Sequence, residues 1–123
     1  MAVHRSGPVG IAVLGAGRIG ANHAEIVARR VPGAALRAVA DPVPGAADRL
    51  AGELGAPTAS TDIRETLRRD DVDAVVISAP ARSHTDLVVA AAEAGKHVFV
   101  EKPMAVTLED ADRAIAAARA AGV

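Results

Sequence analysis

A chain of 123 residues, half of them hydrophobic, is long enough to bury one core without disulfides or metals. The formal net charge of −1 comes from interspersed acidic and basic residues, so no basic face for nucleic acid or a membrane surface is expected. There is no cysteine, which excludes disulfides, thiolate catalysis and cysteine-ligated zinc. No apolar stretch is long enough to span a membrane. Residues 1–8 are interpreted as a short tail. One cytoplasmic domain over residues 1–123 is therefore expected.

The first predicted element is a strand over residues 9–14 that runs into a glycine-rich turn. Its apolar residues suit a strand buried on both faces of a parallel sheet. Gly15, Gly17 and Gly20 follow with the G-x-G-x-x-G spacing of a dinucleotide-binding turn. In such a turn the first glycine permits the tight bend, the second lets the backbone approach a pyrophosphate, and the third lets the next helix pack closely. That helix begins near Arg18 and would aim its free N–H groups at the phosphates.

Asp41 directly follows the second predicted strand, residues 35–40, and lies 21 residues after Gly20. An acidic residue at this distance typically accepts hydrogen bonds from the adenosine ribose hydroxyls. A carboxylate also disfavours a 2′-phosphate, because like charges ~4 Å apart repel by ~4 kcal/mol at an effective dielectric near 20. NAD is therefore expected in preference to NADP. The alternative is that Asp41, followed by Pro42 and Pro44, only starts a turn.

The remaining chain alternates helices and strands, which predicts a doubly wound α/β fold with a parallel sheet. Asp62 with Glu65, and Thr107 with Asp110, have the spacing of capping boxes at two helix starts. Five strands are expected, so the Rossmann fold is cut before its sixth strand. The further predicted helices are 18–31, 46–54, 62–69, 85–94 and 108–121, and the further strands are 57–59, 74–78 and 97–100.

Glu101-Lys102-Pro103 follows the last predicted strand, at the sheet edge where the glycine loop is expected. Lys102 is one of only two lysines beside 12 arginines. Lysine, unlike arginine, can lose its proton when its pKa is lowered. Lys102 is therefore a candidate proton donor, and the alternative is an ordinary surface lysine.

The histidines allow fewer conclusions. His84 lies at the start of the helix after Ser78-Ala79-Pro80, where its imidazole could reach a ligand hydroxyl or could only cap or pack. His23 and His97 are interpreted as structural. The four histidines show no metal-ligand spacing with carboxylates, so no metal is assigned.

Taken together, these motifs resemble the N-terminal domain of the glucose-fructose oxidoreductase, inositol dehydrogenase and rhizopine catabolism family (Gfo/Idh/MocA). The resemblance runs from Val9 onward. It implies that the glycine loop and Asp41 hold NAD, that the 78–80 loop and His84 line the nicotinamide side, and that Glu101 and Lys102 contact cofactor and substrate. Lys102 would assist proton transfer while hydride passes between a sugar or polyol carbon and the nicotinamide. The motifs are Gly15-Ala16-Gly17-Arg18-Ile19-Gly20, Ala40-Asp41, Ser78-Ala79-Pro80 with His84, and Glu101-Lys102-Pro103.

Members of that family continue into a second, mostly β domain that supplies the substrate pocket, most of the oligomer interface and an Asp-x-x-x-His pair. This substrate domain is absent from the sequence, so we expect a cofactor-binding fragment that has little or no activity alone. Substrate positioning can be worth ~7 to 11 kcal/mol of a reaction barrier. A homo-oligomer is expected only with the second domain. Two alternatives are an NAD-assisted glycosidase of the same family and a complete, non-catalytic dinucleotide-binding module.

Overall fold

A five-stranded parallel sheet forms the centre of the computed structural model, which describes residues 6–123. The strand order is β3-β2-β1-β4-β5, as expected for a Rossmann-like α/β fold. All five predicted strands are present, and their bounds differ from the prediction by at most one residue at either end. The strands are β1 (Val9–Leu14), β2 (Ala34–Ala40), β3 (Thr58–Ser60), β4 (Ala74–Ile77) and β5 (His97–Val100).

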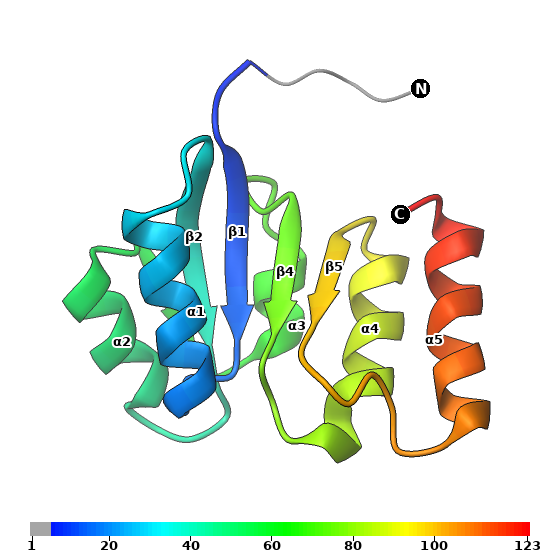
Figure 1. The fold of residues 1–123 in the computed structure, drawn as a ribbon. Coiled ribbons are helices and arrows are strands. Elements are labelled where there is room, and N and C mark those ends of the chain that lie inside the picture. The colour runs from blue at the N-terminus through cyan, green and yellow to red at the C-terminus, as the bar shows by residue number, and fades with distance from the viewer. Residues whose placement is uncertain (1–5) are drawn as a thin grey trace.

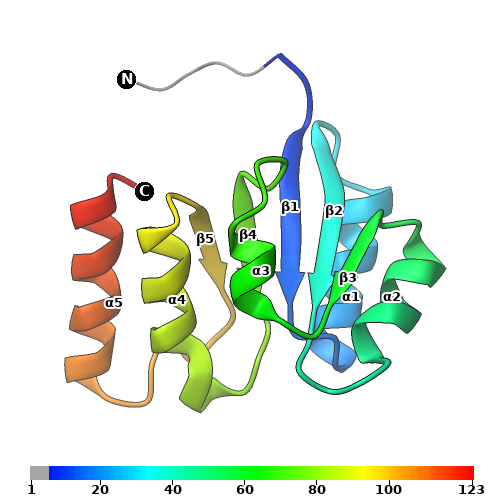
Figure 2. The same cartoon turned by 180° about the vertical axis from the view of Figure 1, so that it is seen from behind.

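Helices cover both faces of the sheet (Figure 1). Helices α1 and α2 lie on one face, and α3, α4 and α5 lie on the other, as the view from behind shows (Figure 2). Within residues 6–123, no helix is both long enough and apolar enough to cross a membrane. The helices are α1 (Arg18–Arg29), α2 (Ala46–Leu54), α3 (Ile63–Leu67), the short 3-10 helix η1 (Ala81–Ser83), α4 (His84–Glu93) and α5 (Leu108–Ala121).

The two faces of the sheet bury separate hydrophobic cores. Val13 and Val76 pack in the core beneath α1 and α2, whereas Leu14 and Ile77 pack in the core on the opposite face. Successive residues of a strand point to opposite faces, so β1 and β4 are apolar on both sides. Burial on both faces explains why the sequences of β1 and β4 are apolar at nearly every position.

At both predicted capping boxes the cap side chain bonds as predicted, but within residues 6–123 neither acidic partner returns a bond to the backbone of its cap residue. The Asp62 side chain accepts hydrogen bonds from two backbone N–H groups of α3, as expected. Glu65 does not return a bond to the Asp62 backbone; its carboxylate instead accepts from Ser60 Oγ at 3.2 Å. Ser60 Oγ accepts from the Asp62 N–H at 2.9 Å and so takes the place of the box glutamate. At the second site, Thr107 Oγ1 accepts from the Asp110 N–H at 3.1 Å.

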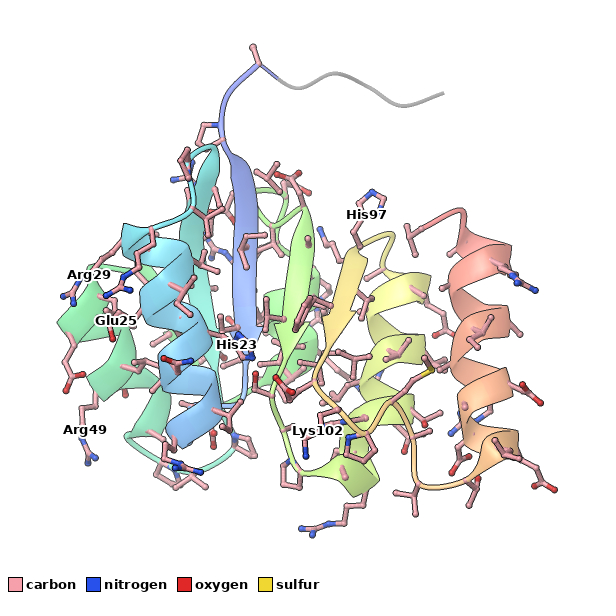
Figure 3. The ribbon with its side chains drawn as sticks, in the orientation of Figure 1. His23, Glu25, Arg29, Arg49, His97 and Lys102 are labelled. Carbon is pink, nitrogen blue, oxygen red and sulfur yellow. The ribbon has the colours of Figure 1, made fainter. Side chains whose placement is uncertain are left out.

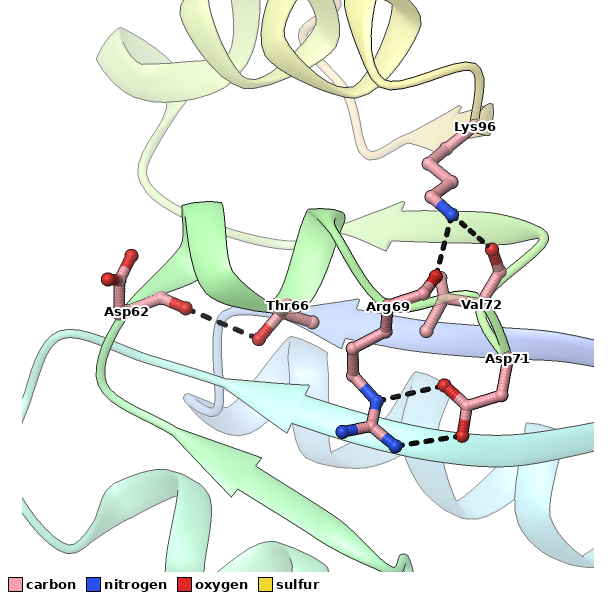
Figure 4. A network of polar contacts seen from close by, with 6 residues as sticks. All are labelled: Asp62, Thr66, Arg69, Asp71, Val72 and Lys96. Carbon is pink, nitrogen blue, oxygen red and sulfur yellow. Dashed lines mark hydrogen bonds and ion pairs between the residues drawn. The ribbon is translucent and has the colours of Figure 1, made fainter.

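The loop that leads into β4 is held by the side chain of Lys96 (Figure 4). Lys96 Nζ donates to the carbonyl oxygens of Arg69 and Val72 at 2.8 and 2.7 Å. Arg69 also forms a two-pronged ion pair with Asp71, at 2.8 and 2.9 Å, and this hydrogen bonding lowers the pKa of the Asp71 carboxyl. One of the two lysines in the chain is thus committed to holding the fold.

Candidate functional site

The carboxyl ends of the parallel strands meet at one edge of the sheet, and the candidate site residues lie in the loops there. Figure 3 shows Lys102 at this edge, whereas His97, at the first position of β5, lies at the opposite edge. Ligands of open parallel sheets bind outside the carboxyl ends of the strands. The fold therefore brings the glycine loop and the loops after β2, β4 and β5 to the usual binding edge.

The glycine loop is shaped by close backbone contacts. Gly15 has a φ of +104°, and a Cβ there would lie 2.8 Å from the backbone of Ser78 and Ala79. A Cβ on Gly20 would collide with the carbonyl oxygen of Gly15. Around Gly17, in contrast, a Cβ would meet no atom within 4 Å, so the backbone is open to an approaching group. No side chain caps α1, and the N–H groups of its first turn are left for an anion such as a pyrophosphate.

Both carboxylate oxygens of Asp41 bind backbone. Oδ2 accepts from the Ala16 N–H at 2.7 Å, and Oδ1 accepts from the Val43 N–H at 2.8 Å. The second contact is the turn that the simpler interpretation predicts, but the first ties Asp41 to the glycine loop itself. A carboxylate has about four lone-pair sites, so it still has acceptor capacity for ribose hydroxyls.

A cavity of about 490 Å³ lies beside this carboxylate. The Oγ of Ser78, next to the glycine loop, is buried and has no hydrogen-bond partner among the described residues. An open glycine backbone, an uncapped helix and an orphaned hydroxyl beside a cavity all fit a dinucleotide. The lining residues are Gly15, Gly17, Asp41, Pro42, Val43, Ile63, Ser78, Ala79, Pro80, Arg82, Ser83 and Leu87.

Sequence reasoning missed part of this lining. Ile63 and Leu87 lie on α3 and α4, where an apolar residue at helical spacing predicts core packing and nothing else. Arg82 lies in η1, which is not among the predicted elements, and its side chain makes no hydrogen bond or ion pair within residues 6–123. No pattern in the sequence marks these residues as pocket walls.

Glu101 and Lys102 lie outside that cavity but at the same edge. Glu101 Oε2 accepts from His23 Nε2 at 2.7 Å, and Oε1 accepts from the Lys102 N–H at 3.1 Å. The hydrogen bond from His23 is the main cause of a lowered Glu101 pKa. Lys102 is exposed, and its ammonium makes no hydrogen bond or ion pair with the described part of the chain. A structural role for His23 is all that its position on a helix predicts, and no signal in the sequence indicates its contact with Glu101.

His84 is packed rather than open to a ligand. Its side chain is only 2% exposed, and its ring nitrogens lie 2.7 Å from the carbonyl oxygens of Pro103 and Ala79. His84 could either contact a ligand hydroxyl or have only a capping or packing role, and this geometry fits the second interpretation. Within residues 6–123, no group of three or more His, Asp or Glu side chains could hold a metal ion.

Comparison with known proteins identifies the fold and the family. The sequence matches the Gfo/Idh/MocA family, described as an oxidoreductase family with an NAD-binding Rossmann fold, over residues 9–123. It is 44% identical over 112 residues to scyllo-inositol 2-dehydrogenase (NAD(+)) of Bacillus subtilis (strain 168), which is 91% of this chain and 33% of that protein.

Solved structures agree with this match. The scyllo-inositol dehydrogenase of Lactobacillus casei with bound NAD(H) and scyllo-inositol is 31% identical, with a TM-score of 0.87 over 94% of this chain and 34% of that one. GenD2 from gentamicin A biosynthesis, in complex with NAD, is 34% identical, with a TM-score of 0.89 over 100% of this chain and 35% of that one. The chain spans about a third of the length of these relatives. It belongs to the Gfo/Idh/MocA oxidoreductase family and comprises that family's NAD-binding Rossmann domain.

Proposed function

We propose that this chain is the cofactor-binding part of a dehydrogenase that transfers hydride between a sugar or polyol carbon and nicotinamide. The observation that carries the proposal is the ammonium of Lys102, which makes no hydrogen bond or ion pair with the described residues and lies at the sheet edge that holds the glycine loop. The other lysine, Lys96, is fixed by two carbonyl oxygens at the far end of β5. The inositol dehydrogenases among the relatives support a polyol as substrate.

In this proposal the cofactor is held mostly by backbone. The N–H groups at Gly17 and in the first turn of α1, from Arg18 to Gly20, bind the pyrophosphate. Asp41 accepts hydrogen bonds from the ribose hydroxyls and from the Ala16 N–H, which it holds in place. The 78–80 loop borders the cofactor. NAD, when bound, supplies the hydride acceptor.

Lys102 has the proton-transfer role. As the carbon–hydrogen bond of the alcohol breaks and its electron pair leaves as hydride, the hydroxyl proton passes to the neutral amine form of Lys102, which becomes the ammonium, and a carbonyl forms. In the reverse direction the ammonium returns that proton. Glu101 directs its two oxygens to His23 and to the Lys102 backbone, and it forms no ion pair with the Lys102 ammonium. The reacting end of Lys102 is thereby left for substrate.

Two measurements test the proposal. Calorimetric titration of the chain with NAD tests the cofactor role, and absence of binding would contradict it. For the catalytic role, the chain replaces the matching third of Bacillus subtilis scyllo-inositol 2-dehydrogenase, and NADH formation is followed with scyllo-inositol. We expect Lys102→Met to lower the rate by about 10²- to 10⁴-fold without weakening NAD binding, as for loss of a general acid–base group.

Arg49→Met is the matched control, because Arg49 is an exposed cation on α2, away from the cavity lining. This variant should keep both NAD affinity and rate. An active chimaera in which Lys102→Met performs as well as the unmodified chain would refute the catalytic role. A chimaera that binds NAD but never reduces it would favour the non-catalytic binding module.

A further inference from the structure

The segment from Glu101 to Pro103 is held at both ends by histidines from different helices. His23 on α1 donates from Nε2 to Glu101 Oε2 at 2.7 Å, and Nδ1 of His84, at the start of α4, lies 2.7 Å from the Pro103 carbonyl oxygen. Between these contacts lies Lys102, whose own side chain is exposed. We infer that His23 and His84 are positioning residues that fix the backbone on either side of Lys102 and so determine where its ammonium lies.

His84 connects two loops of the site. Its Nδ1 lies 2.7 Å from the Pro103 carbonyl oxygen in the loop after β5, and its Nε2 lies 2.7 Å from the Ala79 carbonyl oxygen in the loop after β4. A carbonyl oxygen can only accept a hydrogen bond, and a neutral imidazole carries one N–H, so the ring donates to one of the two carbonyl oxygens and packs against the other. Because the side chain is 2% exposed, water cannot easily replace either contact. The buried ring therefore sets the spacing between the cavity wall and the lysine segment.

His23 connects the same segment to the glycine loop. It lies in the second turn of α1, the helix whose first turn faces the expected pyrophosphate position. Its ring meets the ring of Phe99 edge to face, with centroids 5.5 Å apart, which limits its rotation. The Glu101 carboxylate that it holds also accepts the Lys102 N–H. Through these two hydrogen bonds the Lys102 backbone is tied to α1.

The inference rests on the proposed role of Lys102, but its test can be made without cofactor. Nitrogen-15 relaxation gives the order parameter of the Lys102 backbone N–H in the 123-residue chain. We expect about 0.85 in the unmodified chain, typical of rigid backbone, and below about 0.6 in His23→Phe and in His84→Phe. A histidine that only stabilised the fold would lower the melting temperature without selectively loosening Lys102.

His97→Phe is the matched control, since His97 is exposed at the far end of β5 and should leave the Lys102 order parameter unchanged. His23→Gln, which restores an N–H donor, should recover most of the order. If buried His84→Phe does not fold, the partly exposed His23 carries the test. Retention of wild-type order at Lys102 in either folded phenylalanine variant would overturn the inference. Failure to bind NAD would overturn the proposed function and leave this result standing.

Discussion

Replacing Asp41 by asparagine separates its two expected roles, holding the glycine loop and selecting the cofactor. The carboxylate accepts from the Ala16 N–H at 2.7 Å and from the Val43 N–H at 2.8 Å. An asparagine amide has one oxygen, so one of these backbone donors would face an NH₂ group that is also a donor. Hydrogen bonds to charged groups contribute about 1.5–3 kcal/mol each, so Asp41→Asn should lower the free energy of unfolding by about 1–3 kcal/mol.

Although Asp41→Asn should lower the stability of the fold, it should raise the affinity for NADP. A full charge ~4 Å from the 2′-phosphate costs ~4 kcal/mol at an effective dielectric near 20. Asp41 is partly exposed, and screening by water and salt reduces this repulsion to about 1–3 kcal/mol. Because 1.4 kcal/mol corresponds to a tenfold change in affinity, removing the charge should shift the NADP-to-NAD preference by about 5- to 150-fold towards NADP.

Calorimetric titrations with NAD and with NADP measure this ratio, and urea unfolding measures the stability. Asp48→Asn is the control, because Asp48 is an exposed carboxylate on α2 that lies outside the cavity lining. An unchanged NADP-to-NAD ratio in Asp41→Asn would refute the electrostatic argument. So would tighter binding of NADP than NAD by the unmodified chain.

Three further outcomes are expected. Gly20→Ala forces a Cβ against the Gly15 carbonyl and should cost about 1–3 kcal/mol in urea unfolding, whereas Gly52→Ala, where a Cβ meets nothing, should stabilise by about 0.5–1 kcal/mol. The Glu101 pKa is lowered from its usual 4.5, so the stability that its carboxylate contributes is present above pH 4.5 and is lost as the pH falls through the lowered pKa. The difference in unfolding free energy between the unmodified chain and Glu101→Gln should therefore shrink in acid. Lys96→Met should lower stability by about 1–3 kcal/mol and leave calorimetric NAD affinity unchanged.

The strands and the glycine loop could be predicted because their signals are local. The apolar run of β1 and the glycines after it depend on neighbours in sequence, and so does the Thr107 cap. The His23–Glu101 contact joins residues 78 positions apart, and nothing near either residue marks the other as its partner. Glu65 bonded to Ser60 instead of the Asp62 backbone because β3 places that hydroxyl beside the helix start. Such pairings depend on how the elements come together in space.

The unequal surroundings of the two lysines have a practical consequence. A lysine amine attacks an acylating reagent only when the reagent can reach its nitrogen, and the Lys96 nitrogen is held by two carbonyl oxygens while the Lys102 side chain lies exposed. The sequence contains no cysteine, tryptophan or tyrosine. A dye that couples to lysine side chains should therefore label Lys102 in preference to Lys96. It would give a chain without tryptophan or tyrosine a fluorescent reporter at the edge of the sheet where the cofactor is expected.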